Sequence, residues 1–347
     1  MSSLLLFHPN YYLFFEILGI AAFFMIIVRE AVARHFRRVF EIVSCAVFGV
    51  VLEIGDTYLA HTYSYSSNFL IEVMHVPLVI GAGWATIIYC AMLLSDEYNV
   101  PWQLKPFLDA LTALILDLSM DTVAIRLGFW HWVIPLNQEW YGVPFENLAG
   151  WIFVVFSFSF LMRFLRTLNM DRLSTKMLAI FSPVIAYAAL TVEFAMFDIL
   201  AVLPYGINHW TTFLSSGYHP DLSVLYDPQV QMWKLIVLIV LVTVMAQVSI
   251  WAVVKYWKND RWHFDSLSFM VLAGMHLFFI IALFTSGIYR ELPILAVIGI
   301  GLLLLHCFLH LVPHFVKHTP GYFFRGIKES LAIQSEHAEK IVKTIFK

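Results

Sequence analysis

The chain has 347 residues, of which 61% are hydrophobic and only 13% are charged. A mean hydropathy of +0.79 is too high for an ordinary soluble domain, so the composition predicts a protein whose solvent is lipid. The formal net charge of −3, without a run rich in Lys and Arg, excludes the electrostatic footprint of a nucleic-acid-binding protein.

Nine apolar stretches are long enough to cross a bilayer as helices. Backbone polar groups cannot stay unpaired in hydrocarbon, so the predicted fold is an all-α, polytopic transmembrane helix bundle of about nine spans. In chain order the stretches are 11–28, 42–60, 73–94, 107–127, 148–165, 177–203, 233–254, 267–288 and 292–316. A single transmembrane domain, 1–316, is then followed by a cytoplasmic amphipathic tail, 317–347.

Basic residues in the short connections predict the orientation of this bundle. Lys and Arg gather in alternate connections, and the opposite set of connections has Arg290 as its only basic residue. Positive charge favours the cytoplasmic side, so we expect the N-terminus outside and the C-terminus in the cytoplasm. The predicted location is the cell membrane, as a multi-pass protein.

Acidic side chains inside the spans are the most informative feature, because each costs roughly 2.5–3.5 kcal/mol at the centre of a membrane helix. Glu53 and Asp56 are three residues apart, and Asp117 and Asp121 are four apart, so each pair shares one helix face. Together with Glu193 they fall in the outer half of the predicted bundle. We therefore expect these five candidate catalytic residues to meet in its interior, where one carboxyl kept protonated is a general acid and an ionised neighbour can deprotonate water.

Histidines suggest a different chemistry near the end of the last span. His306, His310, His314 and His318 recur every four residues, and His276 lies in the preceding span. Such a stripe could ligate a metal or haem, but no acidic residue lies beside it in sequence. Hydrogen-bonded packing is the alternative, and we predict no metal site.

One region combines several unusual features within about 35 residues, from Asp117 to Trp151. It reads as an Asp-rich helix, a Gly-x-Trp-x-Trp turn from Gly128 to Trp132, then Tyr-Gly-Val-Pro, an Asn and Gly-Trp. This combination resembles the integral membrane carotenoid-biosynthesis family, which includes carotenoid end-group hydratases. The chain departs from the family pattern at Thr122, where Pro is usual, and at Trp140, where Tyr is common.

The resemblance implies a membrane hydro-lyase that adds water to a terminal double bond of an acyclic carotenoid or related polyprenoid and needs no cofactor. Asp117 or Asp121 would donate the proton, aromatic faces would stabilise the carbocation, and Glu53 or Glu193 would activate water. The aromatic side chains of the region fit either an interfacial belt or an apolar substrate slot. The candidate substrate-binding residues are Trp130, Trp132, Tyr141, Asn147 and Trp151.

Two other functions stay open on the same residues. The buried carboxylates could form the proton relay of a proton-coupled transporter or lipid carrier. The histidines could instead serve a membrane metalloenzyme that acts on lipid. In each case the expected partners are the lipid bilayer and a molecule dissolved in it, not a nucleic acid.

Overall fold

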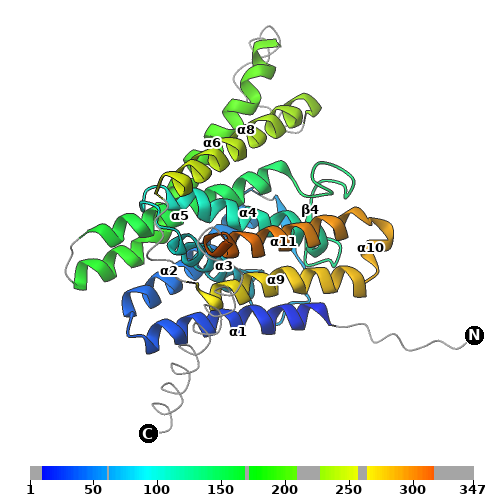
Figure 1. Ribbon diagram of the computed structural model, residues 1–347. Helices are drawn as coiled ribbons and strands as arrows, with labels where there is room; N and C mark the ends of the chain where they lie inside the picture. The colour runs from blue at the N-terminus through cyan, green and yellow to red at the C-terminus, as the bar shows by residue number, and fades with distance from the viewer. Residues whose placement is uncertain (1–9, 61, 169–171, 209–226, 257–263, 316–347) are drawn as a thin grey trace, which may run out of the picture.

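The computed structural model describes residues 10–60, 62–168, 172–208, 227–256 and 264–315, and these form a bundle of long helices (Figure 1). The long helices are α1 (Tyr11–Val32), α2 (Phe36–Ile54), α3 (Leu78–Glu97), α4 (Lys105–Ala124), α5 (Phe145–Thr167), α6 (Arg172–Asn208), α8 (Pro228–Tyr256), α9 (Ser266–Thr285) and α11 (Ile294–Phe315). A π-helical turn, η1 (Gly55–Ala60), continues α2, and the short α10 (Ile288–Glu291) precedes α11. The predicted tail, 317–347, lies outside the described residues.

Each predicted span falls on one of these long helices, which confirms the helical membrane fold. Seven of the described helices are long and apolar enough to cross a membrane, namely α1, α3, α5, α6, α8, α9 and α11. The other two, α2 and α4, each carry four charged residues and are not among these candidate spans. Nine crossings and the orientation of the termini therefore stay predictions.

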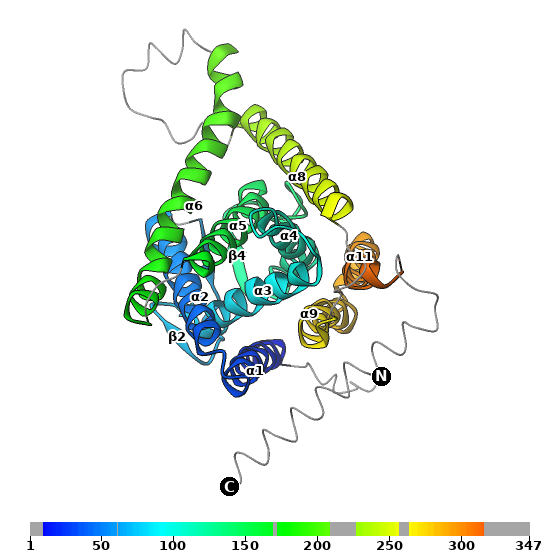
Figure 2. The same cartoon turned by 60° about the vertical axis from the view of Figure 1, so that its left-hand side comes forward.

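The central helices are α3, α4 and α5, and the other long helices surround them (Figure 2). Within its most apolar window α3 is 89% buried, which explains why its sequence has no polar face. Gly19 permits the close approach of α1 to α3, because a Cβ atom there would lie 2.6 Å from Val79 Cγ2. The core of the bundle thus consists of α3 and the side chains packed around it.

Two short ribbons of β-structure interrupt the helical pattern in the connections. Strand β1 (Tyr63–Tyr65) pairs antiparallel with β4 (Trp130–Trp132), and β2 (Glu72–Val73) pairs with β3 (Val76–Pro77). The all-α prediction missed them because strands of two or three residues are too short to produce a hydropathy signal. The β1–β4 ribbon joins the end of α2 to the end of α4, which brings two distant parts of the sequence together.

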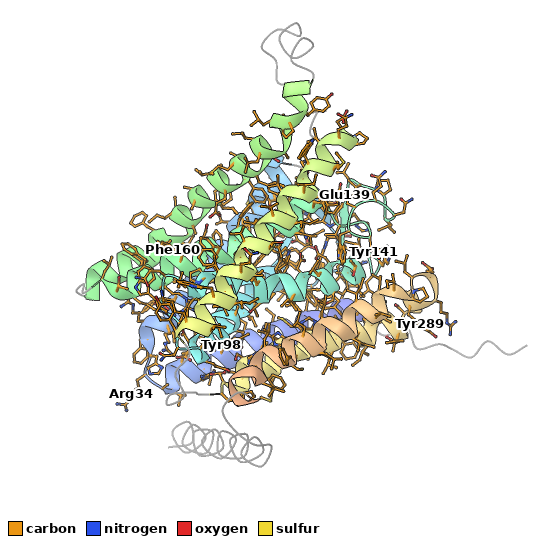
Figure 3. All side chains as sticks on the ribbon, turned by 45° about the horizontal axis from the view of Figure 1, so that its top comes forward. Arg34, Tyr98, Glu139, Tyr141, Phe160 and Tyr289 are labelled. Atoms are coloured by element: carbon orange, nitrogen blue, oxygen red, sulfur yellow. The ribbon has the colours of Figure 1, made fainter. Side chains whose placement is uncertain are left out.

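The two ends of the bundle differ in charge. Arg34 and Tyr98 mark one end, and Glu139, Tyr141 and Tyr289 lie toward the other (Figure 3). Among the described residues, most of the basic side chains lie toward the first end, where Arg29, Arg163 and Arg166 pair with acidic side chains of neighbouring elements.

One ion pair at this basic end is fully buried. Arg163 of α5 is only 4% exposed and lies 3.1 Å from Asp109 and 2.7 Å from Asp96. A buried charge needs such partners, since removing one of them leaves the other uncompensated. Asp109 therefore has a structural role in this network.

Candidate functional site

A cavity of about 80 Å³ lies between α1, α3, α9 and the β1–β4 ribbon. Its wall is mostly apolar and aromatic, with only a few groups that can exchange a proton or hold water. The polar side chains that line it are Glu53, Tyr63, Tyr65, Asp121 and Asn147, and the tryptophans are Trp84, Trp130, Trp132 and Trp151. Two of the predicted acidic residues, Glu53 and Asp121, thus line the same cavity as three of the predicted aromatic residues.

Glu53, near the end of α2, is 4% exposed and accepts three hydrogen bonds. Trp84 Nε1 donates to Glu53 Oε1 at 2.6 Å, and the hydroxyls of Tyr63 and Tyr65 both donate to Glu53 Oε2. An ionised carboxylate offers only acceptors, and this environment offers it only donors. Burial, and then the charge of Glu53, raise the pKa of Tyr63 and of Tyr65 well above the ordinary value, so both phenols stay protonated donors.

Asp117 and Asp121 form a second acidic group, one helical turn apart on α4. They are 0% and 2% exposed and lie on the same face of the helix. Like charges crowded in a buried place repel, so we expect one of the two carboxyl groups to hold a proton. Asn147, in the first turn of α5, donates through Nδ2 to Asp121 Oδ2 at 2.5 Å and to Asp117 Oδ2 at 3.4 Å. Asp121 lines the cavity, and Asp117 lies behind it.

Glu53, Asp117 and Asp121 differ from the acidic residues at the basic end of the bundle. Among the described residues, no Lys or Arg forms a salt bridge with any of the three. Asp109, by contrast, lies 3.1 Å from a guanidinium nitrogen of Arg163. Carboxyl groups that are buried without a cation are costly to keep, which is typical of functional sites rather than of structural ion pairs.

The β1–β4 ribbon places four aromatic side chains against the cavity. Tyr63 is paired with Trp132 and Tyr65 with Trp130, and residues two apart on a strand point to the same face. The ring centroids of Tyr63 and Trp132 are 4.5 Å apart. The rings of Trp84 and Trp151, which also line the cavity, lie 4.4 Å apart.

Four predicted site residues do not line the cavity, so the five acidic residues do not all meet there. Besides Asp117, which lies behind Asp121, these are Glu193, Asp56 and Tyr141. Glu193 of α6 accepts a hydrogen bond from Ser157 at 2.7 Å, because its side chain faces α5. Asp56 lies in the π-helical turn η1 and stays close enough to Glu53 for their charges to interact, but it does not line the cavity. Tyr141 lies in the loop before α5, where its carbonyl accepts from Arg126 at 2.9 Å.

Three residues of the site were not predicted. Tyr63, Tyr65 and Trp84 together hold the carboxylate of Glu53, yet they come from a connection and from another helix. The alternating Tyr-Ser-Tyr pattern, matched by Trp-His-Trp at 130–132, was the available signal for a two-stranded ribbon. Nothing in the hydropathy pattern pointed to Trp84 as a partner of Glu53.

The histidines lie apart from this cavity. His276, His306 and His310 are buried, with ring centroids 5.4 and 4.9 Å apart along the series, and His276 Nδ1 lies 3.2 Å from Ser119 Oγ. The described part of the chain contains no group of three or more His, Cys, Asp or Glu side chains that could hold a metal ion. The side chains of His314 and His318 are outside that part.

Comparison with known proteins concerns the same region of the chain. The sequence model of a family described as "Carotenoid biosynthesis protein" matches residues 11–213, which include Glu53, Asp121 and Asn147. The chain is also similar to bisanhydrobacterioruberin hydratase of Haloarcula japonica, with 42% identity over 41 residues. That alignment covers 12% of this chain and 13% of the relative. No solved structure matches the chain.

Proposed function

Because the chain belongs to the carotenoid biosynthesis protein family, we propose that it is a membrane enzyme that adds water to a terminal double bond of an acyclic carotenoid or related polyprenoid. The similarity to a relative named as a hydratase supports hydration as the reaction. The observation that carries the proposal is that Glu53 and Asp121 line one cavity walled by tryptophan. The cavity thus offers an acid and a base beside an apolar end group.

Asp121 is the proton donor in this proposal. It is the member of the aspartate pair that lines the cavity, and the crowding of two buried carboxyl groups keeps a proton on the pair. Transfer of that proton to the less substituted carbon of the double bond forms a C–H bond and leaves a tertiary cation on the other carbon. Asn147, which donates to both aspartates, positions the pair as the proton leaves.

The aromatic wall then stabilises the cation. Indole faces attract a cation by about 0.5–2 kcal/mol each, more when water is excluded. Trp130, Trp132 and Trp151 all line the cavity, so a cation formed beside Asp121 is surrounded by π-systems. In this proposal the three tryptophans bind the substrate, as the sequence predicts. Tyr141 does not, because it does not line the cavity.

Glu53 completes the reaction as the general base. A water molecule forms a C–O bond with the cation, and its proton passes to the carboxylate of Glu53. Trp84, Tyr63 and Tyr65 orient that carboxylate through their three hydrogen bonds. Return of the proton to the aspartates restores the site, so the cycle consumes only water and substrate and no electrons are exchanged.

Product analysis tests the proposal directly. Purified protein in detergent or lipid is incubated with an acyclic carotene in water enriched in oxygen-18, and we expect a hydroxylated product that carries the label. Asp121→Asn serves as the inactive control. The proposal is wrong if folded protein transfers no labelled oxygen to any acyclic polyene.

A proton-coupled transporter or lipid carrier is the second candidate, because it would use the same buried acidic groups. It predicts movement of a polyprenoid or of protons across proteoliposomes without any change in the molecule carried. Flux that persists without product chemistry would favour it over hydration.

A further inference from the structure

A second hollow, of about 460 Å³, lies next to the cavity on the side of the β1–β4 ribbon. Its wall differs from that of the cavity because most of its side chains carry hydroxyl, carboxyl or imidazole groups. The residues that line it are Thr57, Tyr58, Tyr63, Ser64, Tyr65, Ser67, Glu72 and His75. Ser64, Ser67 and His75 are exposed, so bulk water reaches this polar pocket.

Tyr63 and Tyr65 belong to both spaces. Each lines the polar pocket and the apolar cavity, and each hydroxyl donates to Glu53. The two phenols therefore stand between the polar pocket and the carboxylate that serves as the base. Of the residues that the structure describes, no other lines both spaces.

We propose that the polar pocket is the entrance through which water reaches Glu53, with Tyr63 and Tyr65 as the positioning residues at its inner end. This inference rests on the proposed hydration. An apolar end group fills the cavity from the lipid side, so water has to arrive by a separate route. Water is held where several polar groups surround it, and the polar pocket supplies them whereas the tryptophan wall does not.

The arrangement also separates two chemical requirements. The cation must form in a dry space, since water near the aspartates would compete for their proton. Water must nevertheless meet the cation on the side of Glu53. A pair of phenols hydrogen-bonded to that carboxylate admits water beside the base and keeps it away from Asp121.

The test uses the fate of the cation in deuterated water. A cation that meets no water loses a proton from a neighbouring carbon to the aspartate pair, and the recovered polyene then carries deuterium from the first transfer. Hydration and deuterium exchange therefore report on water delivery and on protonation separately. Both are measured by mass spectrometry on the same incubation with an acyclic carotene.

Ser64→Leu narrows the polar pocket without touching Glu53, because Ser64 lies between the two tyrosines on the opposite face of β1. We expect the rate of alcohol formation to fall about tenfold, equivalent to about 1.4 kcal/mol, while deuterium exchange into the recovered polyene is kept or rises. Ser67→Leu, on the same wall, should act in the same direction. His131→Leu is the matched control, since His131 pairs with Ser64 across the ribbon but lines neither space.

Retained exchange also demonstrates that the variant has folded with a working acid. If alcohol formation and exchange fall together, or neither changes, the polar pocket does not deliver water. A higher KM with an unchanged ratio of alcohol to exchange would mean that the pocket binds part of the substrate, which also overturns the inference. Wild-type protein that neither hydrates nor exchanges any polyene would refute the proposed function, and the inference with it.

Discussion

Replacing Glu53 by glutamine tests the base of the proposed reaction with the smallest change in shape. The glutamate accepts two hydrogen bonds at Oε2 from phenol hydroxyls and one at Oε1 from the indole N–H of Trp84. Glutamine keeps one oxygen and replaces the other with an NH2 group. If the NH2 group faces Trp84, the indole N–H has no acceptor; if it faces Tyr63 and Tyr65, their oxygens can accept from it but their hydroxyl protons lose the acceptor that they had.

Two separate losses follow from this geometry. A buried donor left without its acceptor costs about 1–3 kcal/mol, so we expect the free energy of unfolding to fall by that amount. Loss of a general base costs about 10²- to 10⁴-fold in rate, equivalent to about 2.7–5.5 kcal/mol on the barrier. The rate per folded molecule should therefore drop at least about a hundredfold.

Glu16→Gln is the matched control for stability without chemistry. Glu16 is also a buried glutamate of the bundle, 7% exposed, and Oε1 accepts from the backbone amides of Leu70 at 2.9 Å and Ile71 at 3.4 Å. It does not line the cavity. We expect this variant to lose stability and to keep its hydration rate per folded molecule.

The assay combines thermal unfolding in detergent with the rate of alcohol formation, normalised to the folded fraction. If Glu53→Gln hydrates an acyclic carotene as fast per folded molecule as the wild type, Glu53 is a structural acceptor and not the base. Equal losses of rate in Glu53→Gln and Glu16→Gln would lead to the same conclusion.

Three further predictions use other parts of the site. Asp121→Asn should abolish both deuterium exchange and hydration, whereas Asp117→Asn should lower both rates by less, because only Asp121 of the pair lines the cavity. Equal losses in the two variants would contradict the assignment of Asp121 as the proton donor. Gly83→Leu should raise KM about tenfold, because Gly83 lines the cavity, an added side chain would fill it, and overfilling costs about 1–3 kcal/mol. Gly274→Leu is the control and should leave KM unchanged: an added Cβ has nothing within 4 Å at either glycine, but Gly274 lies on an exposed face of α9. Burial raises the pKa of Glu139 from 4.5 to about 7, so between these pH values the folded protein holds a proton that the unfolded chain releases. The stability that this proton contributes is fully present below pH 4.5 and should be lost as the pH rises to about 7. Glu139→Gln should flatten that part of the curve of unfolding temperature against pH, and an unchanged slope would show that Glu139 does not titrate there.

Some of the site was predictable because it is built from neighbours in sequence. Asp117 and Asp121 share a helix face by their four-residue spacing, and Asn147 follows them within one connection and one helical turn. Trp130 and Trp132, two residues apart, also had to share a face once their segment was extended. Contacts that follow from such short spacing along the chain do not depend on how the helices pack against one another.

The helices of this protein were determined by local features of the sequence. An apolar segment that crosses a membrane must pair its own backbone N–H and C=O groups, and it does so by forming a helix. Which acidic residues meet was decided by tertiary structure alone. Glu53 and Glu193 lie at similar predicted depths, yet the rotation and crossing of their helices turn Glu53 toward Trp84 and Glu193 toward Ser157. Side-chain direction across helices depends on the packing of the whole bundle, and the phenols of Tyr63 and Tyr65 reach Glu53 only because β1 pairs with a strand from a distant part of the chain.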